Sequence, residues 1–240
     1  MTRELRLAAT FVELADTLVD DFDIIDFLEV LTSRCVELLN VTSAGITLAE
    51  DRTGTLTAMA ASDERSRLLG LYEVQVDEGP CRDCCRDGTA VVSVALDEAR
   101  GRWPRFSPQA LAIGFRSAEA VPLRLRREVI GSLNLFHAGP TGLDSVGRSM
   151  AQALADAATI GILQQRTLRR AEDIAGQLQE ALASRVVIEQ AKGVLAERLK
   201  ISPDAAFTIL RTVARSRNRL LSDLARDLVT GSADADQLLR

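Results

Sequence analysis

The stretch from Ser117 to Phe136 reads SAEAVPLRLRREVIGSLNLF. It contains two β-type runs, Ser117 to Leu123 and Val129 to Phe136, joined by the short segment RLRRE at residues 124–128. A connection this short joins strands that run in opposite directions, because parallel strands need a much longer crossover. The stretch therefore predicts an antiparallel hairpin within a larger sheet.

Three more β-type runs precede this hairpin, and turn residues bound each of them. They are Ser43 to Ala49, Thr55 to Ala61 and Ala90 to Val94. Helical spacing of apolar residues predicts one broken helix or two helices from Leu5 to Leu39, and further helices at Asp63 to Leu71, Cys81 to Arg86 and Ser107 to Ile113. The mixture predicts an α+β fold in which helices flank an antiparallel sheet.

Five short motifs in this region carry a resemblance to a known family. They are Val76-Asp77-Glu78-Gly79-Pro80-Cys81, Arg102-Trp103-Pro104-Arg105-Phe106, Gly114-Phe115-Arg116-Ser117, Val121-Pro122-Leu123 and Ile130-Gly131-Ser132-Leu133-Asn134-Leu135. With them, residues 23–163 resemble a GAF domain of the variety found ahead of ANTAR modules in actinobacterial proteins, and residues 1–22 form a helix before it. The resemblance implies a sensor domain, often with a pocket for a small-molecule effector. Family ligands differ widely, so the fold names no ligand and no cofactor.

From Ser145 onward the chain contains no proline until Pro203, and its composition favours one or two very long helices. Apolar and small residues recur there at spacings of three and four, as in the seam of a left-handed coiled coil. The seam positions are Leu154, Ala157, Gly161, Gln164, Leu168, Ala171, Ala175, Leu178 and Leu182. We expect residues 164–183 to form a coiled-coil linker through which the chain makes a homodimer. The alternative is a single helix that packs on its own sheet.

Residues 184–231 have the pattern of a three-helix bundle, and residues 232–240 form a tail. The first helix runs from Ser184 to Leu199, and Ser202-Pro203-Asp204 begins the second with a capping serine and a proline at the first helical position. Leu221-Ser222-Asp223 begins the third in the same manner. Each helix has one apolar face. The faces consist of Ile188, Ala191, Leu195 and Leu199, of Ala206, Phe207, Leu210 and Val213, and of Leu221, Leu224, Ala225 and Leu228.

The sequence of this bundle is similar to the ANTAR pattern along its whole length. The matching strings are Ile188-Glu189-Gln190-Ala191-Lys192-Gly193-Val194-Leu195, Ser202-Pro203-Asp204-Ala205-Ala206-Phe207, Leu210-Arg211 and Leu220 to Val229. ANTAR proteins bind paired stem-loops in nascent RNA and prevent terminator formation, usually as dimers whose coiled coil presents two modules. The resemblance implies a signal-responsive, RNA-binding regulator of transcription antitermination.

Basic residues off the apolar faces are the candidate RNA contacts, because they could meet phosphates or stack on unpaired bases. They are Lys192, Arg198, Arg211, Arg215 and Arg219. The alternative interpretation treats them as solvated surface charges, some of them paired with Glu189, Glu197 or Asp204. We expect no aromatic stacking platform, since the position of Phe207 on an apolar face predicts a core residue.

The charges of the chain divide unevenly between its two parts. The whole sequence has a formal charge of −5, but residues 1–183 carry 19 Lys or Arg against 27 Asp or Glu, whereas residues 184–240 carry 10 against 7. The C-terminal part is therefore the basic one. A DNA-binding helix-turn-helix is an alternative, but its recognition helix would be the third, where Asp223 and Asp227 disfavour entry into a phosphate-lined groove.

Three of the four cysteines, Cys81, Cys84 and Cys85, form a cluster that could bind a metal or respond to oxidation. A closed zinc site needs four ligands, and neither Cys35 nor His137, the sole histidine, lies at a recognisable metal-ligand spacing. A lone histidine is also a weak candidate for a haem ligand. A redox or metal sensor with the same output remains a second hypothesis, beside idle buried cysteines.

No run approaches the roughly 18 to 20 apolar residues that a membrane-spanning helix requires, and the acidic N-terminal stretch does not suit a secretory signal. We expect a cytoplasmic protein with no membrane partner. No nucleophile-base set, phosphate loop or pair of catalytic carboxylates can be assembled, so we expect no enzyme. A purely structural dimer or protein adaptor is the third hypothesis.

Overall fold

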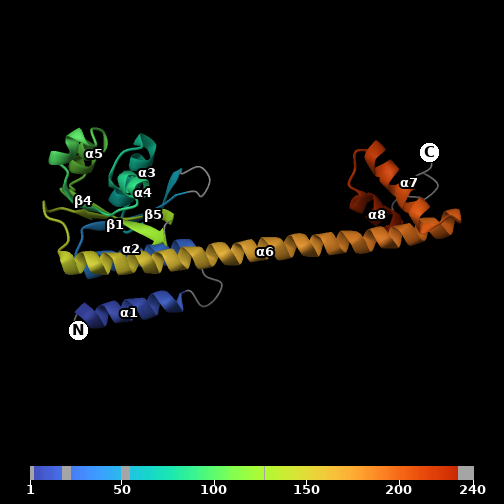
Figure 1. Cartoon of the computed structure of the whole chain (residues 1–240), viewed down its shortest axis with the longest axis horizontal. Coiled ribbons are helices and arrows are strands. Elements are labelled where there is room, and N and C mark those ends of the chain that lie inside the picture. The colour runs from blue at the N-terminus through green and yellow to red at the C-terminus, as the bar shows by residue number, and fades with distance from the viewer. Residues whose placement is uncertain (1–2, 18–22, 50–54, 127, 232–240) are drawn as a thin grey trace. The chain divides into compact units, whose positions relative to one another are not determined.

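A computed structural model describes residues 3–17, 23–49, 55–126 and 128–231 of the chain (Figure 1). The helices are α1 (Arg3–Asp16), α2 (Ile24–Leu39), α3 (Glu64–Val76), α4 (Pro80–Asp87), η1 (Glu98–Gly101), α5 (Phe106–Ala112), α6 (Ser145–Leu199), α7 (Pro203–Ser216) and α8 (Leu221–Thr230). The chain divides into two compact units, residues 1–166 and 167–240. The first unit holds a sheet and its covering helices, the second holds α7 and α8, and α6 contributes to both.

Five antiparallel strands form one sheet in the order β2-β1-β5-β4-β3. The strands are β1 (Ser43–Ala49), β2 (Leu56–Ala61), β3 (Val91–Ala95), β4 (Ser117–Leu125) and β5 (Glu128–His137). The predicted hairpin is confirmed, since Ser117 of β4 pairs with His137 of β5 and Leu125 pairs with Glu128. The predicted α+β fold with an antiparallel sheet is therefore correct.

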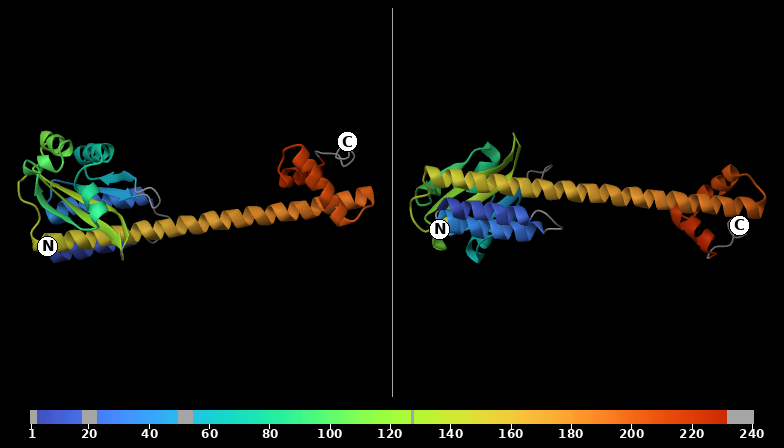
Figure 2. Two further views of the ribbon diagram at one scale, coloured as in Figure 1. Left: turned by 45° about the horizontal axis from the view of Figure 1, so that its top comes forward. Right: turned by 90° about the horizontal axis from the view of Figure 1, so that it is seen from below.

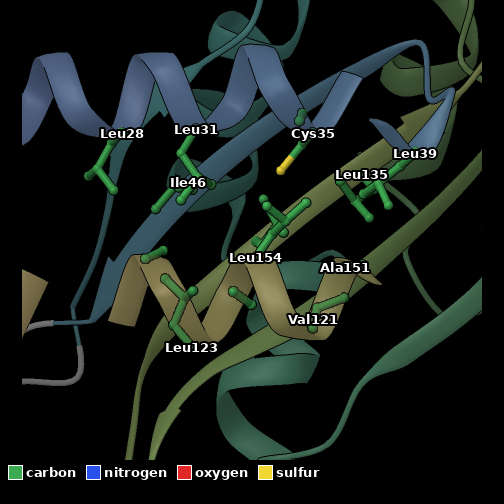
Figure 3. Close-up of a cluster of buried hydrophobic side chains, with 14 of the residues drawn as sticks. Leu28, Leu31, Cys35, Leu39, Ile46, Val121, Leu123, Leu135, Ala151 and Leu154 are labelled. Atoms are coloured by element: carbon green, nitrogen blue, oxygen red, sulfur yellow. The ribbon is translucent and has the colours of Figure 1, made fainter. Parts of the chain in front are cut away.

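One face of the sheet is covered by α2 and the first part of α6 (Figures 1 and 2). Because side chains of a strand alternate between faces, Leu133 and Leu135 of β5 point into this apolar core, while Ser132 and Asn134 point to the other face. The core includes Leu28, Leu31, Cys35, Leu39, Ile46, Val121, Leu123, Leu135, Ala151 and Leu154 (Figure 3). The first stretch of α6 is thus part of the sheet domain.

The opposite face is covered by α3, α4 and α5 (Figures 1 and 2). Four aromatic side chains dominate this second core, since Trp103, Phe106, Phe115 and Phe136 are at most 1% exposed. Phe115 and Phe136 stack with their ring centroids 5.0 Å apart, and Trp103 meets Phe106 edge-on at 5.8 Å. Aromatic pairs of this kind add about 0.5–1.5 kcal/mol beyond the burial of their area.

Two separate helices precede β1, as one of the two sequence interpretations expected. Asp23 caps α2, because its Oδ1 accepts the backbone N–H of Ile25 at 2.7 Å. The acidic run at residues 20–23 also predicts a helix start, and residues 20–22 of this run lie outside the described residues. Helix α1 packs on α2 through Leu14, which is 2% exposed.

Helix α6 is a single helix of 55 residues, and its surroundings change along its length. Leu154, the first position of the predicted seam, is fully buried against the sheet. At this position the helix therefore packs on its own sheet, as the alternative interpretation expects. From residue 167 to residue 183 every residue is exposed, including Leu168 at 50%, Leu178 at 60% and Leu182 at 56%. None of the helices in the described part of the chain is both long and apolar enough to cross a membrane.

The end of α6 forms a small bundle with α7 and α8, in agreement with the predicted three-helix module. The core of the bundle consists of Ala191, Leu195, Ala206, Leu210, Val213, Ala214, Leu224, Ala225 and Leu228. Ser202 caps α7 by accepting the N–H of Ala205 at 3.2 Å, as the sequence predicts. The expected serine cap of α8 is wrong, because α8 begins after Leu220 and Ser222 already lies within its first turn.

Phe207 was expected in the core of the bundle, and this expectation is wrong. Its ring is half-buried and lies outside the apolar cluster, with Nζ of Lys192 5.6 Å from the ring centroid. Helical spacing placed Phe207 beside Ala206, but only Ala206 points into the bundle. The bundle therefore does present one aromatic ring near its surface.

Candidate functional sites

The string Glu-Gly-Pro-Cys at residues 78–81 forms the joint at the start of α4. Gly79 has a φ of 143°, and a Cβ there would lie 2.7 Å from Cγ of Glu73, so only glycine fits. Oε1 of Glu78 accepts the backbone N–H of Phe106 at 2.7 Å, which ties this joint to the start of α5. The motif thus fixes the positions of two helices over the sheet.

Glu73 lies beneath this joint, in the interior of the domain. It is 1% exposed, and its Oε1 accepts the backbone N–H of Cys81 at 2.6 Å. Its Oε2 has no hydrogen-bond partner among the described residues. Burial raises the pKa of Glu73 well above its usual value, because the charged form loses its hydration. Glu73 is therefore a buried acid that favours its protonated form.

The Trp-Pro motif is held in place by Asp83 of α4. Oδ2 of Asp83 accepts Nε1–H of Trp103 at 3.0 Å and Nε–H of Arg102 at 2.7 Å. The guanidinium of Arg102 also lies 4.9 Å from the centroid of the Trp103 ring. A buried carboxylate with these partners fixes the loop ahead of α5, so this motif is also structural.

The three clustered cysteines lie on α4. Cys81 and Cys84 are buried, whereas Cys85 is half-buried. A hydrogen bond with Cys85 and burial raise the pKa of the Cys81 thiol, and burial raises the pKa of Cys84 to about 12. Within the described residues no group of three or more His, Cys, Asp or Glu could hold a metal ion. The reactive thiolate form is thus disfavoured at Cys81 and Cys84.

His137 lies at the end of β5, where its side chain is 9% exposed. Its Nε2 is 3.9 Å from Oε1 of Glu119 and has no hydrogen-bond partner in the described part of the chain. Burial lowers the pKa of His137, although the nearby carboxylate opposes this shift. Glu119 already accepts the hydroxyl of Ser93 at 2.8 Å and the backbone N–H of Leu143 at 2.6 Å. His137 therefore belongs to a buried polar group that anchors the entry to α6.

A pocket of about 240 Å³ lies between β1, β2 and α3. Its lining consists of Glu29, Gly45, Ile46, Thr47, Ala58, Met59, Ala60, Ala61, Ser66, Arg67, Gly70, Leu71, Asn134 and Phe136. Glycine and alanine supply five of these residues, so the pocket exists because side chains are short there. No motif in the sequence indicates this pocket, because the glycine and alanine residues that line it form no recognisable pattern.

Two of the lining residues, Thr47 and Asn134, belong to a buried polar group on the second face of the sheet. Nδ2 of Asn134 donates to Oγ1 of Thr47 at 3.1 Å, and Oδ1 of Asn134 accepts the hydroxyl of Ser132 at 2.9 Å. All three side chains are at most 2% exposed. The alternation of Ser132 and Asn134 with Leu133 and Leu135 was the available signal, because it places polar groups on a buried face.

Two of the five candidate RNA contacts form an open cationic surface on α7. Arg211 and Arg215 are one helical turn apart and both are exposed. No ion pair among the described residues includes either side chain. Thr208 and Thr212 lie on the same exposed side of the helix. We refer to these four residues as the α7 face.

The remaining candidates have different surroundings. Nζ of Lys192 lies 2.9 Å from Oε2 of Glu189, and its side chain is only 17% exposed because it covers Phe207. Nη2 of Arg219 lies 2.7 Å from Oδ2 of Asp227 on α8, so this charge is compensated. Arg198 is exposed near the end of α6. Arg211 and Arg215 therefore lie together on α7, whereas Lys192 and Arg219 each form an ion pair with a neighbouring carboxylate.

The sheet domain is similar in fold to several solved structures. The GAF domain of an Acinetobacter phosphoenolpyruvate-protein phosphotransferase is 17% identical, with 70% of this chain and 97% of that chain covered and a TM-score of 0.52. The free methionine-R-sulfoxide reductase from Neisseria meningitidis, solved with its substrate, is 17% identical, with coverages of 69% and 91% and a TM-score of 0.53. A phycoerythrobilin-bound GAF domain from a cyanobacterial phytochrome is 16% identical, with coverages of 70% and 98% and a TM-score of 0.53.

Identities this low establish the fold alone, and the sequence itself gives the family. No curated protein matches the chain. The family model of the GAF domain matches residues 23–163, and that of the ANTAR domain matches residues 176–229. Both resemblances found in the sequence are thereby confirmed. The chain belongs to the GAF domain family, and its GAF domain is followed by an ANTAR domain in the two-domain GAF-ANTAR arrangement.

Proposed function

We propose that the chain is a cytoplasmic regulator of transcription antitermination that binds paired RNA stem-loops through its ANTAR domain. The observation that carries this proposal is the α7 face, where Arg211 and Arg215 are exposed and form no ion pair with any of the described residues. Exposed guanidinium groups can contact phosphates and stack on unpaired bases. Two regulatory domains in one chain favour a regulator over an enzyme.

One ANTAR domain offers few unpaired cations, so we infer that two copies act together. The linker part of α6 supplies a surface for pairing, because Leu168, Leu178 and Leu182 are at least half exposed at coiled-coil spacing. Two linked domains gain affinity for two linked stem-loops, since the second contact becomes intramolecular. A homodimer therefore accounts for both the exposed seam and the paired form of the RNA target.

The GAF domain supplies the signal in this proposal, and its pocket supports that role. The pocket is lined by buried hydrogen-bonding side chains, which a merely filled core would not need. Sensing of a metal or an oxidant by the cysteine cluster is less well supported, because Cys81 and Cys84 are buried and their thiols are hard to ionise. We therefore place the sensing site in the pocket between the sheet and α3.

A titration of the full chain against three labelled nucleic acids tests this function. They are an RNA with two adjacent stem-loops, the same RNA with one stem-loop, and a DNA duplex of equal length. We expect the two-loop RNA to bind at least tenfold more tightly than either of the others. Equal affinity for all three would contradict stem-loop recognition, tighter binding to the duplex would support the DNA-binding alternative, and no binding would leave the adaptor hypothesis.

A further inference from the structure

The size of the GAF-domain pocket limits what it can hold. Its volume of about 240 Å³ lies just below the range of about 300–1,000 Å³ that is typical of sites for drug-sized ligands. A Cβ on Gly70 of α3 would already contact Cβ of Ala58 on β2 at 3.6 Å, so these two walls lie close together. This volume favours an occupant smaller than a nucleotide or a tetrapyrrole.

The buried hydrogen-bonding groups of the pocket are uncharged. Thr47, Ser66 and Asn134 are each 2% exposed and line it. The hydroxyl of Ser66 is engaged by Oδ1 of Asp63 at 2.7 Å. The amide of Asn134 donates one proton to Thr47, and its second proton has no acceptor among the described residues. Asn134 can therefore donate a hydrogen bond to an acceptor atom of a bound molecule.

Two charged residues, Glu29 and Arg67, line the pocket, and the cationic one does not offer a free counter-charge. Glu29 is exposed. Arg67 gives Nε and Nη2 to the carboxylate of Glu64 at 2.7 Å and 2.6 Å, and its side chain is 55% exposed. An anionic ligand that entered the pocket would lose hydration without gaining a new ion pair, which disfavours its binding. The pocket chemistry thus disfavours anions.

We propose that this pocket binds a small uncharged molecule that presents a carbonyl or similar acceptor to Asn134, of the class of carboxamides and free nucleobases. The inference rests on the sensing role proposed above and specifies the chemistry of the effector. Both the small volume of the pocket and the lack of a free cation for a phosphate disfavour a cyclic nucleotide.

Two probes of almost identical shape test the charge preference directly. Nicotinamide is an uncharged carboxamide, and nicotinate carries a carboxylate in its place at neutral pH. Ligand-detected saturation-transfer NMR on the full chain should show transfer to nicotinamide and none to nicotinate. Transfer to nicotinate that equals or exceeds transfer to nicotinamide would overturn the proposal, and so would the absence of transfer to nicotinamide.

Three variants locate the binding and separate it from a general effect on the fold. Asn134→Asp keeps the shape but removes the donor and adds a charge, so nicotinamide should bind about tenfold more weakly or not at all. Ala58→Leu should abolish binding by filling the space. Gln177→Glu makes the same amide-to-acid change on an exposed part of α6 and should bind like the unmodified chain.

Retained nicotinamide binding in Asn134→Asp would contradict the assigned contact. RNA affinity measured on the same proteins without the probe is independent of the pocket and should not change. If the unmodified chain binds nicotinamide but no RNA, the proposed function is overturned and the ligand class stands. If it binds RNA but no nicotinamide, the ligand class is overturned and the proposed function stands.

Discussion

Oε1 of the buried Glu73 accepts the backbone N–H of Cys81 at 2.6 Å, and this contact anchors the start of α4 above the centre of the sheet. It explains why glycine occupies position 79, since any side chain there would enter the space of Glu73. The Glu-Gly-Pro-Cys motif at residues 78–81, which is typical of the family, thus has a structural role in packing α4 on the sheet. Its energetic role can be measured in two ways.

Gly79→Ala should destabilise the GAF domain by about 2–4 kcal/mol, because it adds backbone strain at a φ of 143° and a clash with Glu73. Trp103 is the only tryptophan of the chain and lies in this domain, so its fluorescence during denaturation reports the change. Gly101→Ala is the matched control, since a Cβ there meets nothing within 4 Å, and it should change stability by less than about 0.5 kcal/mol. Equal effects of the two substitutions would contradict this account of position 79.

The raised pKa of Glu73 predicts a dependence of stability on pH. The folded state holds the proton more tightly than the unfolded state, whose carboxyl titrates near 4.5. The contribution of protonated Glu73 to the free energy of unfolding is therefore complete below that pH and is lost as the pH rises toward the folded pKa. The free energy of unfolding then falls by at most about 1.4 kcal/mol per pH unit. Glu73→Gln keeps an acceptor for Cys81 and should remove this slope.

Denaturation followed by Trp103 fluorescence at a series of pH values above 4.5 makes that comparison. Glu37→Gln, on the exposed side of α2, is the control and should leave the pH profile unchanged. A Glu73→Gln profile that parallels the unmodified one would mean that Glu73 is ionised in the folded protein.

The burial of the cysteines predicts their reactivity toward a water-soluble disulfide reagent. In the native chain one of the four thiols, that of the half-buried Cys85, should react promptly. Cys35, Cys81 and Cys84 should react only when the domain unfolds, because burial excludes the reagent and raises their pKa values. Cys85→Ser should abolish the fast phase. Prompt reaction of all three clustered thiols would instead support the redox hypothesis.

The exposed seam on α6 predicts a dimer that one charge can break. Leu178→Lys places an ammonium group in the proposed seam and should shift the chain from dimer to monomer at micromolar concentration, as measured by light scattering after gel filtration. Gln177→Lys adds the same charge to the neighbouring exposed position and should leave the dimer intact. A monomeric unmodified chain, or two dimeric variants, would contradict pairing through this seam.

The sequence predicted the sheet well because each strand is short, rich in apolar residues and bounded by turn residues, as with Ser43 to Ala49. The prediction erred where spacing alone had to distinguish core from surface. Phe207 follows Ala206 on one side of α7, yet only the alanine is buried. The packing of the neighbouring helices determines which of the two residues is buried, and the helical spacing of apolar residues does not reveal that packing.

The candidate sites were predictable to different degrees. The basic residues of the ANTAR domain were visible in the sequence, but their pairing was not, since Arg219 finds Asp227 only when α8 folds back toward α7. The pocket was invisible, because a cavity is defined by side chains that are missing, as at Gly45 and Gly70. Local pattern thus predicts elements, while three-dimensional packing decides which polar groups remain available.

The salt dependence of RNA binding tests most directly whether the α7 face binds RNA. Each phosphate contact that is removed should lower the slope of log Kd against log salt concentration by about one unit. The double variant Arg211→Ala/Arg215→Ala is compared with Arg6→Ala/Arg100→Ala, which removes equal charge from exposed positions of the first unit. The two-loop RNA is the ligand in both cases.

We predict that Arg211→Ala/Arg215→Ala weakens binding at least tenfold and reduces the salt slope, while Arg6→Ala/Arg100→Ala retains the affinity and slope of the unmodified chain. Circular dichroism should show equal helix content in all three proteins, since both arginines of α7 are exposed. Unchanged affinity and slope in Arg211→Ala/Arg215→Ala would contradict the assignment of the α7 face as the RNA-binding surface.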